Sequence, residues 1–116
     1  MADTANTTAS KPEIGAEVKT VLNIRNVTTI PNSISEFNIY TYKAEIDTTT
    51  NIKRPGFFNP GYSIFEVGDV IRVFQLEKDK TLSKYYEFMV MKVDKTIKEV
   101  VVTILNEKNL EKNIIS

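Results

Sequence analysis

The chain of 116 residues carries 15 basic and 15 acidic side chains, and 41% of its residues are hydrophobic. This size predicts one domain with a modest core. The formal charge of zero provides no electric field to attract nucleic acid or an anionic membrane. The apolar runs fall far short of the ~20 residues that a membrane span needs. The sequence has no cysteine and no histidine, so we expect no disulfide, no metal or cofactor site and no enzymatic activity.

Residues 1–33 are rich in Thr, Asn and Ala and contain no aromatic residue. Such a segment has little to bury, so it is either a disordered leader or an N-terminal arm that a partner orders. Its periodicity fits both a helix and a short strand around residues 16–27. If it is an arm, we expect it to tether the domain to a partner protein through its aliphatic side chains: Ile14, Val18, Val21, Leu22, Ile24 and Val27.

A β domain is expected at residues 34–106. Residues 36–46 alternate in the manner of a half-buried strand, with Phe37, Ile39 and Thr41 opposite Tyr40 and Tyr42. The stretch that follows, "RPGFFNPGYSIFEVGDVIRVF", concentrates glycine, proline and phenylalanine. We interpret it as a loop that folds back and plugs one end of the sheet, in preference to a ligand cleft.

The plug and the turn that ends it depend on a few residue types. Glycine accepts a positive φ without steric cost, so glycines mark the sharp turns. The aromatic side chains are too apolar to remain in water, and an aspartate after the last glycine is expected to accept backbone N–H bonds. The structural residues so assigned are Gly56, Phe57, Phe58, Asn59, Gly61, Phe65, Gly68 and Asp69.

Three further alternating segments, 69–77, 85–93 and 98–106, are joined by two polar connections: the charged "EKDKTLSK", long enough to protrude, and the tight turn "DKTIKE". These connections predict hairpins, and therefore an antiparallel C-terminal meander followed by a tail at residues 107–116. Both faces of these strands carry apolar side chains, so both faces need cover from a second layer or another subunit. We predict an all-β fold, a small antiparallel barrel or sandwich, in a homo-oligomer.

The same stretch resembles a pattern found in small proteins of phage and prophage structural-gene clusters. That pattern combines Gly-Tyr/Phe-Phe-Asn with a later Val-Gly-Asp-x-Ile and a final aromatic strand, over roughly residues 38–105, and Pro60-Gly61 departs from it. The resemblance implies a virion component, a head decoration or head-fibre protein that self-associates, with a trimer favoured, and docks on a capsid or other virion protein. The matching positions are Thr41, Gly56, Phe57, Phe58, Asn59, Phe65, Val67, Gly68, Asp69, Ile71, Tyr86, Phe88, Val90 and Val93.

The alternative is a small β-barrel module that binds carbohydrate or peptide. The exposed tyrosines would distinguish the two: Tyr40, Tyr42 and Tyr62 in an open groove favour the binding module, whereas their burial between subunits favours assembly. An enzyme is disfavoured because the aspartates near predicted turns, Asp47, Asp69 and Asp94, are not paired at acid–base or metal-cluster spacing.

Overall fold

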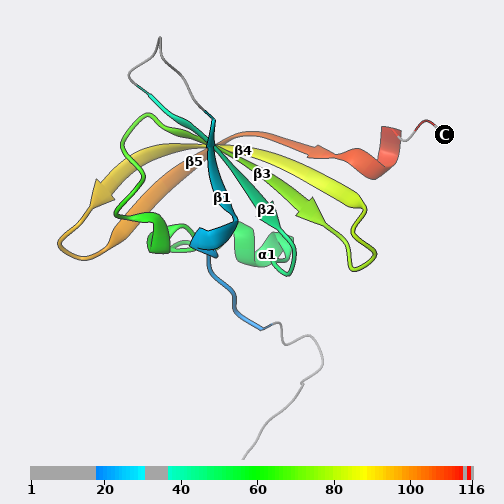
Figure 1. Cartoon of the computed structure of the whole chain (residues 1–116), viewed down its shortest axis with the longest axis horizontal. Helices are drawn as coiled ribbons and strands as arrows, with labels where there is room; N and C mark the ends of the chain where they lie inside the picture. Colours follow the sequence, from blue (N-terminus) through cyan, green and yellow to red (C-terminus); the bar gives the residue numbers. More distant parts are fainter. Residues whose placement is uncertain (1–17, 31–36, 114, 116) are drawn as a thin grey trace, which may run out of the picture.

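A computed structural model describes residues 18–30, 37–113 and 115 of the chain. It contains one five-stranded sheet with the strands in sequence order (Figure 1). No helix among the described residues is long and apolar enough to cross a membrane. The elements are η1 (Ile24–Asn26), β1 (Val27–Ile30), β2 (Ile39–Ala44), α1 (Thr49–Ile52), η2 (Asn59–Gly61), β3 (Val70–Leu76), β4 (Leu82–Asp94), β5 (Glu99–Asn109) and η3 (Leu110–Asn113).

The sheet is mixed. Strands β3, β4 and β5 pair antiparallel in order, which confirms the predicted meander, and β1 pairs antiparallel with β2. Strand β2, however, pairs parallel with β3, with Ile39 opposite Val70. A parallel pair requires a crossover connection, and residues 45–69 provide it. The all-β class is therefore confirmed, but the expected antiparallel barrel or sandwich is not seen: the described residues form one open sheet, and β1 and β5 are its edges.

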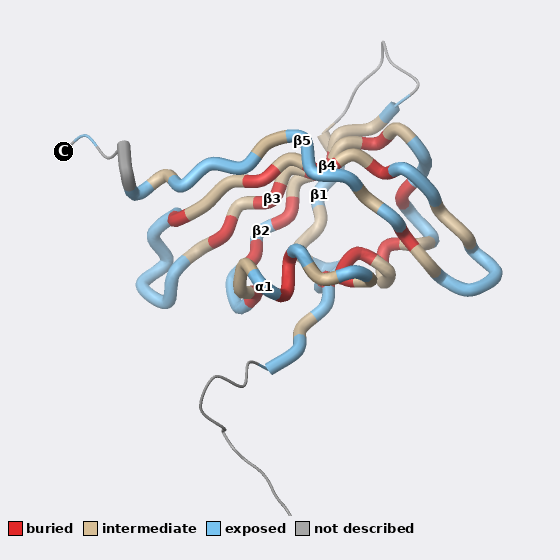
Figure 2. The backbone as a smooth tube through the Cα atoms, turned by 180° about the vertical axis from the view of Figure 1, so that it is seen from behind, coloured by how far each residue is buried: buried red, intermediate tan, exposed pale blue. Residues whose placement is uncertain are grey.

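The crossover covers one face of the sheet, which we call the covered face. Figure 2 shows buried backbone along the strands and along this crossover, which runs beneath the arched sheet. The plug residues Phe57, Phe58 and Phe65 are buried here, with Ile52 of α1. The aromatic rings pack edge-on: the ring centroids of Phe57 and Phe58 are 5.0 Å apart, and those of Phe65 and Tyr40 are also 5.0 Å apart. From the sheet they meet Tyr40, Tyr42, Ala44, Ile71, Val73, Tyr86, Phe88, Val90 and Val100.

The turn before β3 is built as its residue types require. Gly68 has φ +95° and donates its N–H to Val90 O at 2.8 Å. The buried carboxylate of Asp69 accepts the backbone N–H groups of Asn38 and Glu66 at 3.0 and 2.8 Å. These bonds fasten the start of β2 and the end of the crossover to one side chain, so Asp69 is a structural residue of the turn.

The remaining plug positions also have local structural explanations. Gly56 has φ +89°. The Phe65 ring lies where a Cβ on Gly61 would stand, 2.2 Å from it. The side chain of Asn59 accepts the N–H of Val100 at 2.8 Å, which links the crossover to edge strand β5. The plug is thus attached to edge strand β5.

Part of the expected N-terminal arm belongs to the domain itself. Leu22 is 3% exposed within the core, and its N–H donates to Phe57 O at 2.9 Å. Val27 packs against the core at the start of β1. The domain therefore begins before β1, earlier than the boundary expected at residue 34. The Thr-rich strand β1 is held by backbone pairing with β2, and Leu22 supplies the apolar anchor. At the other end, β5 runs to Asn109, beyond the expected boundary at 106.

The other expected arm anchors are not in the core. Val18 is 82% exposed, and Val21 and Ile24 are also exposed. Ile14 lies outside the described residues. Val18, Val21 and Ile24 therefore remain available for contact with another molecule.

Candidate functional site

The face of the sheet opposite the crossover carries no second layer among the described residues, and we call it the open face. Strand alternation and the register between the strands place its side chains. None of them is buried, and the apolar ones come from all five strands. They are Ile30, Ile39, Val70, Phe74, Leu76, Leu82, Met89 and Val101.

An ion pair lies near the middle of the open face. Arg72 of β3 is directly opposite Glu87 of β4, and Arg72 Nε is 3.7 Å from Glu87 Oε2. The same carboxylate oxygen accepts the Tyr85 hydroxyl at 2.6 Å. The Tyr85 ring packs on Phe74 with centroids 5.1 Å apart. Burial and then the hydrogen bond to Glu87 raise the pKa of Tyr85 to about 12. The face is therefore apolar around an opposite-charge pair.

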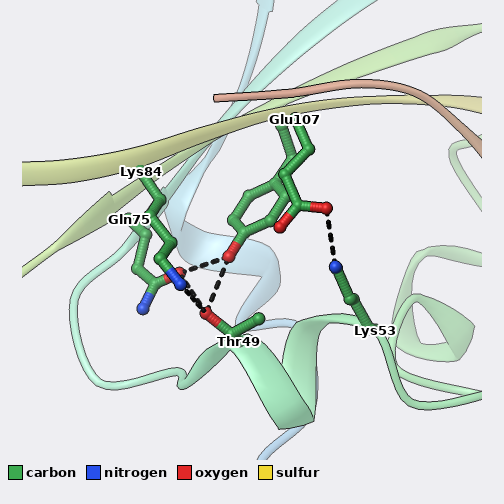
Figure 3. Close-up of polar contacts among 6 residues, drawn as sticks. Thr49, Lys53, Gln75, Lys84 and Glu107 are labelled. Atoms are coloured by element: carbon green, nitrogen blue, oxygen red, sulfur yellow. Dashed lines mark hydrogen bonds and ion pairs between the residues drawn. The ribbon is translucent and has the colours of Figure 1, made fainter. Parts of the chain in front are cut away.

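On the covered face, α1 rests on a polar cluster (Figure 3). The Tyr86 hydroxyl donates to Gln75 Oε1 at 2.8 Å and lies 2.8 Å from Thr49 Oγ1. Lys84 Nζ also donates to Thr49, at 3.2 Å. Buried polar groups that are satisfied in this way fix the position of an element rather than add much net stability. The cluster has a partner for each hydroxyl, so we assign it to holding α1 on the sheet.

The second buried polar cluster ties the N-terminal segment to the crossover. Asp47 is buried; it accepts the Tyr42 hydroxyl at 2.6 Å and the Thr20 hydroxyl. The Tyr42 oxygen accepts the N–H of Asn23 at 3.1 Å. Burial, and next the hydrogen bond to Asp47, raise the pKa of Tyr42 above its usual value. Asp47 therefore has structural partners, as Asp69 does.

Raised tyrosine pKa values predict alkaline instability. Burial raises the pKa values of Tyr40, Tyr42, Tyr85 and Tyr86 in the folded protein. An unfolded tyrosine ionises near pH 10, so above that pH the folded state binds more protons and stability falls. We expect the urea midpoint to be constant between pH 8 and 9 and to fall steadily from pH 10 to 12. The Tyr42→Phe variant should show a shallower fall over the same interval, and an unchanged parental midpoint at pH 11.5 would contradict the assignment.

The tyrosines do not form the aromatic groove that would favour a carbohydrate-binding module. Tyr40 and Tyr42 are buried inside the domain, with 6% and 1% of their surface exposed. Tyr62 is half-buried on the crossover, with Lys98 Nζ 5.7 Å from its ring centroid. These three residues therefore do not distinguish a binding module from an assembly protein, because Tyr40 and Tyr42 pack within one chain.

A groove of about 470 Å³ lies between the crossover and edge strand β5. Ile52 and Phe58 line it from the crossover, and Val102 and Ile104 line it from β5. The ion pair between Lys53 and Glu107, 2.6 Å apart, bridges these two walls. Among the described residues no strand pairs with the outer edge of β5, so this groove is a second candidate surface.

The acidic side chains in the part of the chain that the structure describes form no metal-binding cluster. No group of three or more Asp or Glu side chains there is placed to hold a metal ion. Asp94 accepts the N–H of Thr96 at 2.9 Å in the β4–β5 turn. The three aspartates that the sequence singled out thus lie in three separate structural sites. Comparisons of the chain with protein-family models, with curated proteins and with solved structures find no match.

Proposed function

We propose that this protein is a non-enzymatic structural component of a phage particle, a capsid-surface decoration or head-fibre protein. It acts by self-association and by docking on another virion protein. The open face carries the proposal, because a sheet with aliphatic and aromatic side chains on its uncovered side is suited to contact with another protein. The phage context rests on the resemblance of residues 38–105 to small virion proteins.

The proposed docking on a capsid or other virion protein uses the N-terminal arm. The exposed side chains of Val18, Val21 and Ile24 support it, since they lie where the chain enters the domain. Leu22 no longer belongs to this contact surface, because it is in the core. The proposed arm is therefore shorter than residues 1–33, because the chain is already anchored in the domain at Leu22.

We expect the chain to be present in purified particles at a fixed ratio to the major capsid protein. Particles released from the cells that encode it would be banded in a density gradient and analysed by quantitative mass spectrometry. A second gradient of lysate in which the free chain is overproduced without particles provides the control, and there the chain should stay near the top. Particle bands that contain the capsid protein but not this chain would contradict the proposed function.

A binding module for an extended peptide is the second candidate function, and the groove beside β5 favours it. A peptide that adds a strand to an exposed edge places alternate side chains on one face. Beside β5 those side chains would meet Val102 and Ile104. This candidate differs from the first because the chain would be absent from particle bands. The carbohydrate form of this alternative loses its support, since Tyr40 and Tyr42 are buried.

A further inference from the structure

The central ion pair of the open face is incompletely satisfied within one chain. Arg72 Nε is buried yet donates no hydrogen bond, and it is 3.7 Å from Glu87 Oε2. The two side chains remain 39% and 27% exposed. A guanidinium has five N–H donors and suits a carboxylate best when two of them bind it side by side. Nε itself is covered, but the side chain is 39% exposed, so the exposed part of the guanidinium can bind another carboxylate above the sheet.

The apolar side chains around this pair would gain from cover. Phe74, Leu76 and Leu82 lie on one side of it, and Val70, Met89 and Ile39 lie on the other, as the strand register shows. An ion pair exposed on one side contributes little by itself, because water screens it. A partner that brings both apolar side chains and opposite charges would remove that water and satisfy Arg72.

The size of the face is at the threshold for a specific interface. Five strands lie ~4.8 Å apart and β3 has seven residues at ~3.3 Å each, which makes a footprint of roughly 500 Å². Two such faces bury roughly 1,000 Å² together, about the minimum for a specific contact and typical of a reversible one.

The charges on the open face decide which partner fits. Arg72 and Glu87 have opposite signs and are next to each other, so a partner with charges of one sign would meet repulsion from one of them. A second copy of the same face, turned by a two-fold axis, presents glutamate to arginine and arginine to glutamate. Isologous contacts of this kind are self-complementary and are the commonest in homo-oligomers.

We propose that the open face is a two-fold self-association surface, in which Arg72 of each copy binds Glu87 of the other. This inference rests on the self-association part of the proposed function and names its surface. It also changes the expected symmetry, because face-to-face packing of two sheets gives a pair of chains, whereas the resemblance to head-fibre proteins favours a trimer.

Charge reversal tests the proposal with the full chain. We expect the parent to sediment as two chains at tens of micromolar. Arg72→Glu and Glu87→Arg should each raise the dissociation constant at least tenfold, because each copy then meets like charges, and close charge pairs at interfaces couple by about 1.5 kcal/mol or more. An equimolar mixture of the two variants should associate again, since one face is then acidic and the other basic.

Matched controls carry the same charge changes elsewhere. Lys19→Glu and Glu66→Arg alter exposed residues away from the open face and should associate like the parent. Circular dichroism would verify folding; if a reversal variant does not fold, Arg72→Gln and Glu87→Gln take its place, each with an expected severalfold weakening. A parent that stays monomeric at several hundred micromolar, a three-chain mass, or variants that associate like the parent would overturn the proposal. The presence of the chain in particles would be unaffected by any of these results.

Discussion

Replacing Gly68 by valine should lower the free energy of unfolding by about 2–4 kcal/mol. Gly68 has φ +95°, a conformation that a β-branched residue adopts only with strain of about 1–3 kcal/mol. A Cβ there would also lie 2.5 Å from the Phe37 ring, so that ring must move. For a domain of about 100 residues the loss corresponds to a fall in melting temperature of roughly 10 °C or more.

The position next to it provides the control for this substitution. Val67 is 57% exposed, so Val67→Ala should change the melting temperature by only a degree or two. Gly68→Ala should lie between the two, because alanine adds a Cβ but no branch. Should Gly68→Val melt at the parental temperature, the turn before β3 would have to be relaxed in solution, and the assigned role of Gly68 would be wrong.

Local patterns made the C-terminal half of the fold predictable. Period-two alternation marked β3, β4 and β5, and short polar connections between them left antiparallel pairing as the simple outcome. The Val-Gly-Asp turn was also readable, because glycine and aspartate perform specific backbone tasks there. In the structure Asp69 binds two backbone N–H groups, as that residue type suggested.

The arrangement of the other strands depends on contacts that no local pattern reports. The direction of β2 relative to β3 is set by the path of the crossover, which returns the chain along the sheet before β3 begins. Strand β1 is short and Thr-rich, and its place in the sheet comes from pairing with β2. In the sequence, Leu22 cannot be told apart from the exposed aliphatic residues near it. Only the tertiary structure shows that its side chain is buried.

The open face was also predictable only in part from local sequence patterns. Alternation by itself places Arg72 and Phe74 on one face, and it predicted that both faces of the sheet are apolar. That Arg72 is opposite Glu87, and Phe74 opposite Tyr85, follows from the register between β3 and β4. Register depends on the length and bulge of the connecting hairpin, which the sequence indicates only loosely. The charged centre of the open face was therefore not expected.

The segment from Val18 to Ile30 contributes buried Leu22 and strand β1 to the domain. Deleting residues 1–33 should leave a protein that is largely unfolded at 25 °C. The deletion removes buried Leu22, and a large-to-small change at a buried leucine alone costs about 2–5 kcal/mol. It also removes β1, which pairs with β2, and the Thr20 hydroxyl that binds Asp47. Against a total stability of about 5–15 kcal/mol for such domains, these losses together are decisive.

Deleting only residues 1–17 should preserve the fold, because buried Leu22, strand β1 and the Thr20 hydroxyl that binds Asp47 all remain. Thermal melts of the two truncated chains, followed by circular dichroism, would separate these outcomes. Two point variants refine the comparison: Leu22→Ala should lower the melting temperature by roughly 10 °C, and Val18→Ala, at a position that is 82% exposed, should leave it unchanged. A cooperative melt near the parental temperature after removal of residues 1–33 would mean that β1 and Leu22 are dispensable, and that the domain does begin near residue 34. The opposite result would make the segment from Val18 to Ile30 part of the folding unit, with the exposed side chains of Val18, Val21 and Ile24 as the surface proposed to dock on a virion protein.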